Sequence, residues 1–143
     1  MIYTSYFAMI RNMPDNVIPV GISQYPPSWF NGSSLKEVAP PKELLLGYKK
    51  GGVTDEEYDC VYKKEVLYKL NVDAFIDALS FLSGVENVAT NEDVHVALCC
   101  FEKDGDFCHR HLLSDFLNAK GISCREIKKE ELLHMHIDDE REL

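Results

Sequence analysis

The side chains best suited to chemistry lie in one short stretch, Cys99 to His111, which reads CCFEKDGDFCHRH. It holds three of the five cysteines, two of the five histidines, one arginine and three acidic residues in thirteen positions. An apolar run precedes it and a helical pattern follows it, which predicts a turn between a strand and a helix. Such side chains supply nucleophiles, proton donors and acceptors, metal ligands or anion contacts.

Cys108 is the candidate nucleophile of this stretch. The pattern places it near the second position of the predicted helix, beside His109 and Arg110. A helix start and neighbouring cations lower the pKa of a thiol and so favour the reactive thiolate. The alternative interpretation is a small buried residue that packs the start of the helix. The spacing does not match the phosphatase loop, which needs five residues between its cysteine and its arginine.

Four neighbours of Cys108 are candidates for proton transfer or ligand binding. Glu102 follows the predicted strand and acts as a general base, or forms a structural ion pair with Arg110. Arg110 lies where the first helical N–H groups have no intrahelical partner, so it is suited to hold a phosphate or carboxylate. His109 is an acid, a base or a ligand donor, or it bonds a loop carbonyl. Cys100 is assigned to the same ligand site, and Asp106 is expected to cap the helix.

A metal site is a further interpretation of the same residues. Cys108 and His111 are three positions apart and share a face of the predicted helix, while Cys100 approaches from the strand. Three such ligands leave the fourth position of a zinc ion open. The sequence has no Cys-x-x-Cys pair, so we assign no metal ligands and expect no cofactor.

A sheet must position these side chains. Strands are predicted over 1–7, 17–23, 94–101 and 122–127, and helices over 54–70, 71–84, 106–121 and 128–135. The helix 54–70 begins with a capping box formed by Thr54 and Glu57. This alternation predicts an α/β fold with three layers, a mainly parallel sheet of four or five strands and helices on both faces. Residues 1–127 form one α/β domain, to which the C-terminal helix and acidic tail (128–143) belong.

The predicted pocket lies beyond the carboxyl ends of the strands, where open α/β sheets bind their ligands. There the loop Ser23 to Trp29 approaches the segment 100–110. Tyr25 and Trp29 stack on a base or sugar, or anchor this loop to the core. We therefore predict that the protein binds a phosphate-bearing ligand, a nucleotide or nucleic-acid end. Whether it also processes that ligand stays open. The alternatives are a non-catalytic module that sequesters a nucleotide or docks a protein, and a small metalloprotein.

Bulk composition excludes several classes of protein. The chain has 143 residues, 45% of them hydrophobic, and a formal net charge of −9. This acidity argues against general nucleic-acid binding, which depends on Lys and Arg to neutralise phosphates. No apolar run reaches the roughly 20 residues that a membrane helix needs, and the N-terminus lacks the pattern of a signal peptide. An odd number of cysteines favours free thiols, so we expect a cytoplasmic protein without membrane contact.

The stretch CCFEKDGDFCHRHLLSDFL resembles the signature of a bacterial and phage family, domain of unknown function 488. Members of that family have an apolar strand ending in Cys-x-Glu, a short loop, and Cys-His-Arg at the start of a helix. The matching residues here are Cys100, Glu102, Cys108, His109 and Arg110. The segments MIYTSYF, QYPPSWFNG and GGVTDEEYDCVYKKEVLYKL extend the likeness over residues 2–127. The resemblance implies an α/β fold and a shared pocket.

One position departs from the family pattern. Many relatives have Asp-x-Arg at the end of the second strand, where this sequence has Gly21, Ile22 and Ser23. The arginine of that family motif is therefore missing from this chain.

Overall fold

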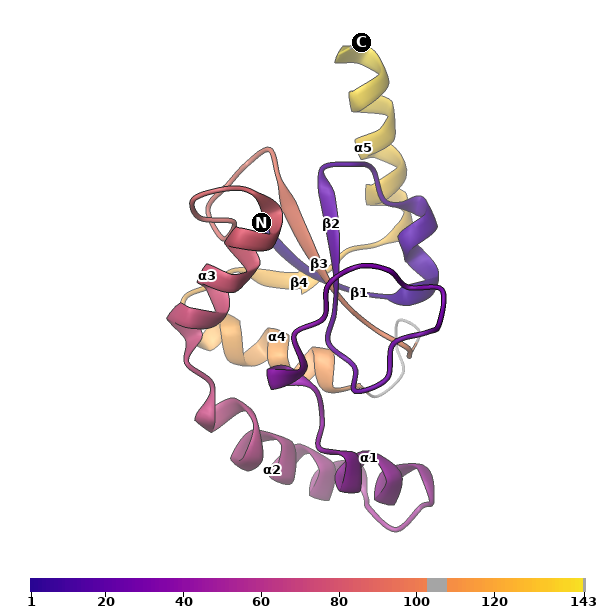
Figure 1. Cartoon of the computed structure of the whole chain (residues 1–143), viewed down its shortest axis with the longest axis vertical. Helices are drawn as coiled ribbons and strands as arrows, with labels where there is room; N and C mark the ends of the chain where they lie inside the picture. The colour runs from indigo at the N-terminus through magenta and orange to yellow at the C-terminus, as the bar shows by residue number, and fades with distance from the viewer. Residues whose placement is uncertain (103–107, 143) are drawn as a thin grey trace.

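The computed structural model describes residues 1–102 and 108–142, and the side chains of residues 1–102 and 108–136. Four strands form one sheet in the order β2-β3-β1-β4, and every pairing is parallel (Figure 1). Their bounds are Ile2–Tyr6 for β1, Val17–Gly21 for β2, His95–Cys100 for β3 and Cys124–Glu126 for β4. The parallel four-stranded sheet confirms the predicted fold class.

Helices cover both faces of this sheet, which confirms the three layers. The helices are α1 (Lys42–Lys49), α2 (Asp55–Glu65), α3 (Val72–Ser83), α4 (His109–Ala119) and α5 (Lys129–Glu142), with 3₁₀ turns at Phe7–Asn12, Lys36–Val38 and Leu67–Lys69. One core cluster joins the sheet to α2, α3 and α4, and a smaller cluster joins the other face to α5 and the first 3₁₀ turn (Figure 1). None of the helices in the described part of the chain combines the length and apolarity that a bilayer crossing requires.

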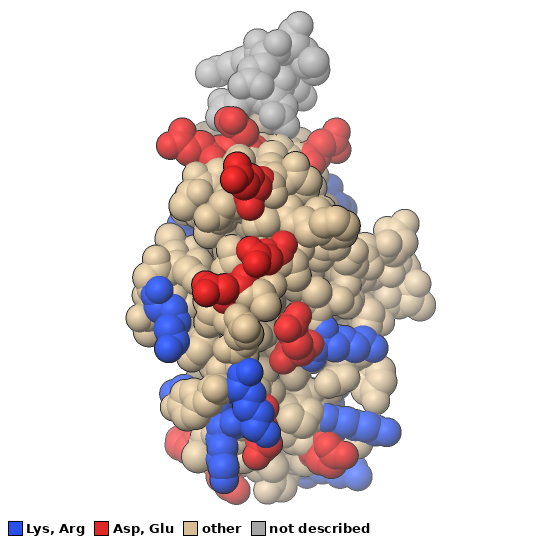
Figure 2. Space-filling model, turned by 60° about the vertical axis from the view of Figure 1, so that its left-hand side comes forward, with Lys and Arg blue, Asp and Glu red and all other residues tan. Residues whose placement is uncertain are grey.

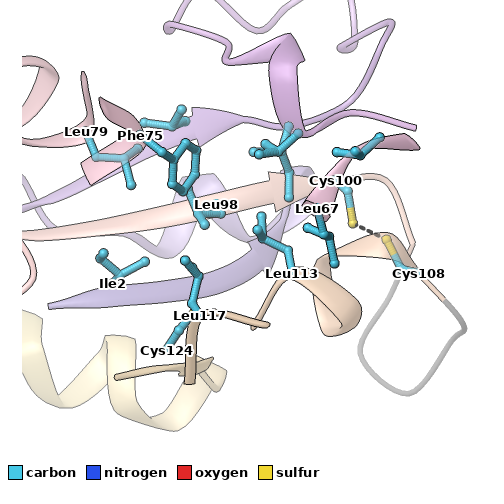
Figure 3. Close-up of a cluster of buried hydrophobic side chains, with 14 of the residues drawn as sticks. Ile2, Leu67, Phe75, Leu79, Leu98, Cys100, Cys108, Leu113, Leu117 and Cys124 are labelled. Atoms are coloured by element: carbon cyan, nitrogen blue, oxygen red, sulfur yellow. Dashed lines mark hydrogen bonds between the residues drawn. The ribbon is translucent and has the colours of Figure 1, made fainter. Parts of the chain in front are cut away.

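Strand β3 shows how the sheet sorts neighbouring side chains. Successive residues of a strand point to opposite faces. Cys99 therefore packs into the smaller cluster, whereas Leu98 and Cys100 pack into the larger one. Figure 3 shows Cys100 at one end of the larger cluster, with Cys108 beside it. Two cysteines that are adjacent in sequence thus serve different cores.

Local sequence signals fixed several boundaries correctly. Thr54 caps α2 and forms the predicted capping box with Glu57. Gly84 ends α3 with φ of 70°, a conformation that glycine adopts without strain.

Other boundaries were predicted wrongly. Helix α1 was missed, the predicted helix 54–70 divides after Glu65, and α5 continues to Glu142 where a tail was expected. Helix α4 begins at His109 with Cys108 as its N-cap residue. The proposed cap, Asp106, lies outside the described residues.

Tyr62 links α2 to the loop that follows β2. Its hydroxyl donates a hydrogen bond of 2.6 Å to the buried carbonyl of Val38. We expect Tyr62→Phe to lower the free energy of unfolding by about 1–3 kcal/mol, because the carbonyl keeps its burial and loses its donor. Urea denaturation measures this loss. Tyr68→Phe is the control, since the Tyr68 side chain is 71% exposed. Equal unfolding midpoints for the two variants would contradict the assignment.

Candidate functional site

The parallel sheet brings the predicted residues to one edge. Strand β3 ends at Cys100, which pairs with Tyr6 at the end of β1, while Cys99 pairs with Gly21 at the end of β2. Because all strands run the same way, their carboxyl ends lie together. Cys108 opens α4 at this edge, and its Sγ lies 2.6 Å from the Sγ of Cys100 (Figure 3). Both cysteines are free thiols.

The side chain of Arg110 is fully buried next to Cys100. Its Nε and Nη2 donate to the two carboxylate oxygens of Glu126 at 2.9 and 3.0 Å. Its Nη1 donates to the carbonyl oxygen of Glu102 at 2.6 Å and to the Sγ of Cys100 at 2.8 Å. The guanidinium also lies over the ring of Tyr6, 5.7 Å from its centroid. Four protein groups thus hold this cation in place.

These contacts correct two predictions about Arg110. Its ion-pair partner is the carboxylate of Glu126, and Glu102 contributes its backbone carbonyl to Arg110. The predicted role of Arg110 as ligand anchor does not fit its position, because its side chain is fully buried and does not line the pocket. Arg110 instead ties the end of β3 to α4 and β4.

His109 is buried and uncharged. Its Nε2 donates a hydrogen bond of 2.7 Å to the carbonyl of Ile22, which fixes the proton on that nitrogen. The unprotonated Nδ1 then faces the Sγ of Cys108 at 3.5 Å. Burial lowers the pKa of His109 to about 4. The result is a neutral imidazole with a lone pair directed at the thiol.

Among the described residues, three polar groups surround the sulfur of Cys108. Besides His109 Nδ1, its Sγ lies 3.2 Å from Glu102 Oε2 and next to Cys100 Sγ. Burial raises the pKa of the Cys108 thiol well above its usual value, and the neighbouring Cys100 and Glu102 raise it further. The predicted lowering of this pKa was therefore wrong. The physical reason is that Cys108 is the buried N-cap residue of α4 and has the acidic side chain of Glu102 as its neighbour.

A cavity of about 490 Å³ opens in front of Cys108. This volume lies in the range of small-molecule sites. Five of the predicted site residues line it, namely Ser23, Tyr25, Glu102, Cys108 and His109. Cys100 is buried behind Cys108 and does not line it. Trp29 lies outside this cavity, 59% exposed and edge-on to the ring of Phe7.

Six lining residues were not predicted as site residues: Pro40, Leu45, Tyr48, Lys49, Tyr58 and Phe101. Three of them lie on α1, which a proline before Lys42 and glycines at 51 and 52 could have revealed as a helix. The helical spacing of Tyr58 and Tyr62 in the sequence predicts that both side chains belong to the core. Tyr58 packs edge-on against Tyr48, 5.1 Å between ring centroids, and also lines the cavity.

Cys100, Glu102 and Cys108 also form a group that could hold a metal ion, since their ligand atoms lie within 4.8 Å of one another. Glu102 takes the place that was considered for His111. Two thiolates on one tetrahedral zinc lie about 3.8 Å apart, since each Zn–S bond is about 2.3 Å. The two sulfurs here are 2.6 Å apart. They would have to separate before they could share a zinc ion.

Comparison with known families gives one match. Residues 6–121 match the family model described as the active DUF488-N3 subclade, DUF488-N3a. This range contains all the residues named above as lining the cavity and both the Cys-x-Glu and the Cys-His-Arg motif, so it confirms the predicted resemblance. No curated protein and no solved structure matches the chain.

The Arg110–Glu126 pair is expected to be essential for stability. Glu126→Ala leaves a buried guanidinium without its carboxylate, which costs about 3–5 kcal/mol of unfolding free energy. Glu131→Ala is the matched control, because it removes an ion pair with Arg125 that lies at the surface and is worth about 1 kcal/mol or less. Urea denaturation of both variants tests this difference. Similar losses would show that the buried pair has no special role.

The neutral state of His109 predicts a pH dependence of stability. The folded pKa of about 4 lies below the ordinary value of 6.5, so the unfolded chain takes up the proton first. The stabilisation is complete above pH 6.5 and is lost as the pH falls towards 4. Across this window we expect the wild type to lose roughly 3 kcal/mol more than His109→Gln. Urea denaturation at several pH values measures the two profiles, and parallel profiles would contradict the assignment.

Proposed function

The chain belongs to the DUF488 family, and we propose that it binds a small phosphate-bearing ligand, a nucleotide above all, and processes it with Cys108 as nucleophile. One observation carries this proposal. A thiol with two proton acceptors within 3.5 Å, Glu102 and His109, lines a cavity with aromatic walls. The name of the matched subclade includes the word active, which agrees with a catalytic role.

The aromatic side chains support a flat ligand. Tyr25, Tyr48, Tyr58 and Phe101 all line the cavity. Tyr25 and Phe101 each expose more than half of their surface, so a base can stack on them without displacing the core. A nucleotide offers the flat ring that these side chains can cover.

Positive charge for the phosphate comes from α1. Lys49 lines the cavity and is exposed. Figure 2 shows Lys and Arg side chains gathered towards the end of the molecule that carries α1 and α2 in Figure 1, whereas acidic side chains prevail above them. The net charge of −9 is thus unevenly spread. The start of α4 adds partial positive charge from its first N–H groups.

Catalysis would couple proton transfer to attack by the thiol. Burial keeps Cys108 protonated at rest, because it raises the pKa of the thiol. As Sγ attacks an electrophilic carbon or phosphorus of the ligand, Nδ1 of His109 or the carboxylate of Glu102 accepts the proton. The same group then returns it to the leaving group, whose bond to that carbon or phosphorus breaks. Water hydrolyses the remaining adduct and frees the Cys108 thiol. The carbonyl of Ile22 holds the imidazole in the required tautomer throughout.

Sequestration without turnover is the second candidate function. The raised pKa of Cys108 favours it, since a thiol that stays protonated is a weak nucleophile. The two functions share the pocket and differ only in the fate of the ligand.

A thermal-shift screen tests the pocket. We expect nucleotides to raise the melting temperature of the chain, and nucleosides or inorganic phosphate to do so less. Tyr25→Ala should weaken nucleotide binding about tenfold, because stacking on one base is worth about 1–3 kcal/mol. Trp29→Ala is the control, since Trp29 is as exposed as Tyr25 and lies outside the cavity. No response to any phosphate compound, or equal effects of the two variants, would overturn the ligand assignment.

Chromatography of the bound nucleotide then separates the two functions. We expect Cys108→Ser to abolish product formation while its nucleotide-induced thermal shift persists. Product formation by Cys108→Ser at the wild-type rate would show that Cys108 is not the nucleophile. A wild-type protein that binds nucleotide and returns it unchanged would establish sequestration.

A further inference from the structure

Two thiols at different depths meet behind the cavity. Cys108 lines the cavity, whereas Cys100 is fully buried and does not. Their sulfurs lie 2.6 Å apart. A movement of less than an ångström would bring them to the bonding distance of about 2.05 Å. One sulfur is placed to meet a ligand, and the other is placed to react with whatever the first has bound.

We propose that Cys100 and Cys108 form a dithiol–disulfide couple, in which Cys108 exchanges with a low-molecular-weight disulfide and Cys100 resolves the adduct. This proposal rests on the proposed function in one respect, the role of Cys108 as the nucleophile of the pocket. It adds a second reacting group, Cys100, and a second class of ligand, a small disulfide such as glutathione disulfide.

The exchange balances without further reactants. Cys108 gives its proton to His109 or Glu102 and attacks one sulfur of the disulfide RSSR. A Cys108–S–S–R bond forms, and the first RSH leaves with that proton. The Sγ of Cys100 then attacks the Sγ of Cys108 and displaces the second RSH, which takes the proton of Cys100. Two protein thiols and RSSR thus become one internal disulfide and two RSH. A dithiol reductant reduces the internal disulfide to two thiols again and is itself oxidised to a cyclic disulfide.

The surroundings of Cys100 suit a resolving thiol. The Nη1 of Arg110 donates to its Sγ at 2.8 Å. Glu126 and the carbonyl of Glu102 hold the guanidinium in this position. A fixed cation stabilises the negative charge that develops on this sulfur during exchange. Arg110 therefore acts here as a positioning residue.

The other cysteines do not share these features. Cys99 follows Leu98 in the same strand, but its side chain points to the opposite face and contacts the carbonyl of Ala97. It is as buried as Cys100 and is the natural control.

Oxidation of the Cys100–Cys108 pair would remove the nucleophile from the cavity and join the end of β3 to the start of α4. The redox state of the pair would then switch the site off and on.

The test uses the full chain, incubated with glutathione disulfide, alkylated and mapped by mass spectrometry. We expect the wild type to form a Cys100–Cys108 cross-link that dithiothreitol reverses, after a transient glutathione adduct on Cys108. Cys100→Ser should retain that adduct at a level several-fold higher, because the resolving thiol is absent. Cys99→Ser should behave as the wild type. Cys100→Ala is a second variant that lacks the resolving thiol. The time course of adduct and cross-link in the wild type tests the proposal without any substitution.

Several outcomes would overturn the couple. These are equal adducts in the wild type and Cys100→Ser, no reaction at Cys108, or one zinc per chain that both Cys100→Ser and Cys108→Ser lose. Metal analysis of the purified wild type and of both variants reads the last of these directly. The nucleotide thermal shift keeps the two proposals apart. A thermal shift without the cross-link contradicts only the dithiol–disulfide couple. A cross-link without the thermal shift contradicts only the proposal that the ligand is a nucleotide.

Discussion

The buried guanidinium of Arg110 is the constraint on which the site depends. A charge removed from water is costly unless protein groups replace its hydration, and here those groups come from segments that are distant in sequence from one another or from Arg110. Glu126 lies on β4, Cys100 ends β3 and Glu102 follows it. Glu126 also accepts a hydrogen bond of 2.7 Å from Thr4 on β1. The hydrogen bonds and the ion pair around this one buried cation therefore fix three strands and α4 relative to one another.

This arrangement also decides the electrostatics of the cavity. Glu126 neutralises the charge of Arg110 away from the cavity, so the groups that line the cavity include a thiol, a neutral imidazole, a carboxylate, aromatic rings and the ammonium group of Lys49. Burial keeps protons on Cys108 and off Nδ1 of His109, since it raises the first pKa and lowers the second. The pair is thus at rest as thiol and imidazole. Chemistry at Cys108 must move a proton at the same time as it forms a bond.

The location of the site was predictable, and most partners within it were not. The alternation of strands and helices predicted the parallel sheet, whose carboxyl edge collects Ser23, Glu102 and Cys108. The helical spacing of Tyr58 indicated burial but could not show that this side chain also lines a cavity. Helix α1 was missed because its short pattern follows a long proline-rich loop. Its contribution to the cavity was missed with it.

The sequence by itself determined which residues are candidates, because adjacent positions in a strand, a turn and a helix start are set by local patterns. It also determined the family, through motifs that lie within eleven residues, Cys100 to Arg110. Only the tertiary structure decided what each candidate does. The partner of Arg110 lies 16 residues away and the partner of His109 lies 87 residues away. Hydrogen bonds between such distant segments leave no local pattern, yet they decide that Arg110 supports the site from behind and that His109 faces the thiol.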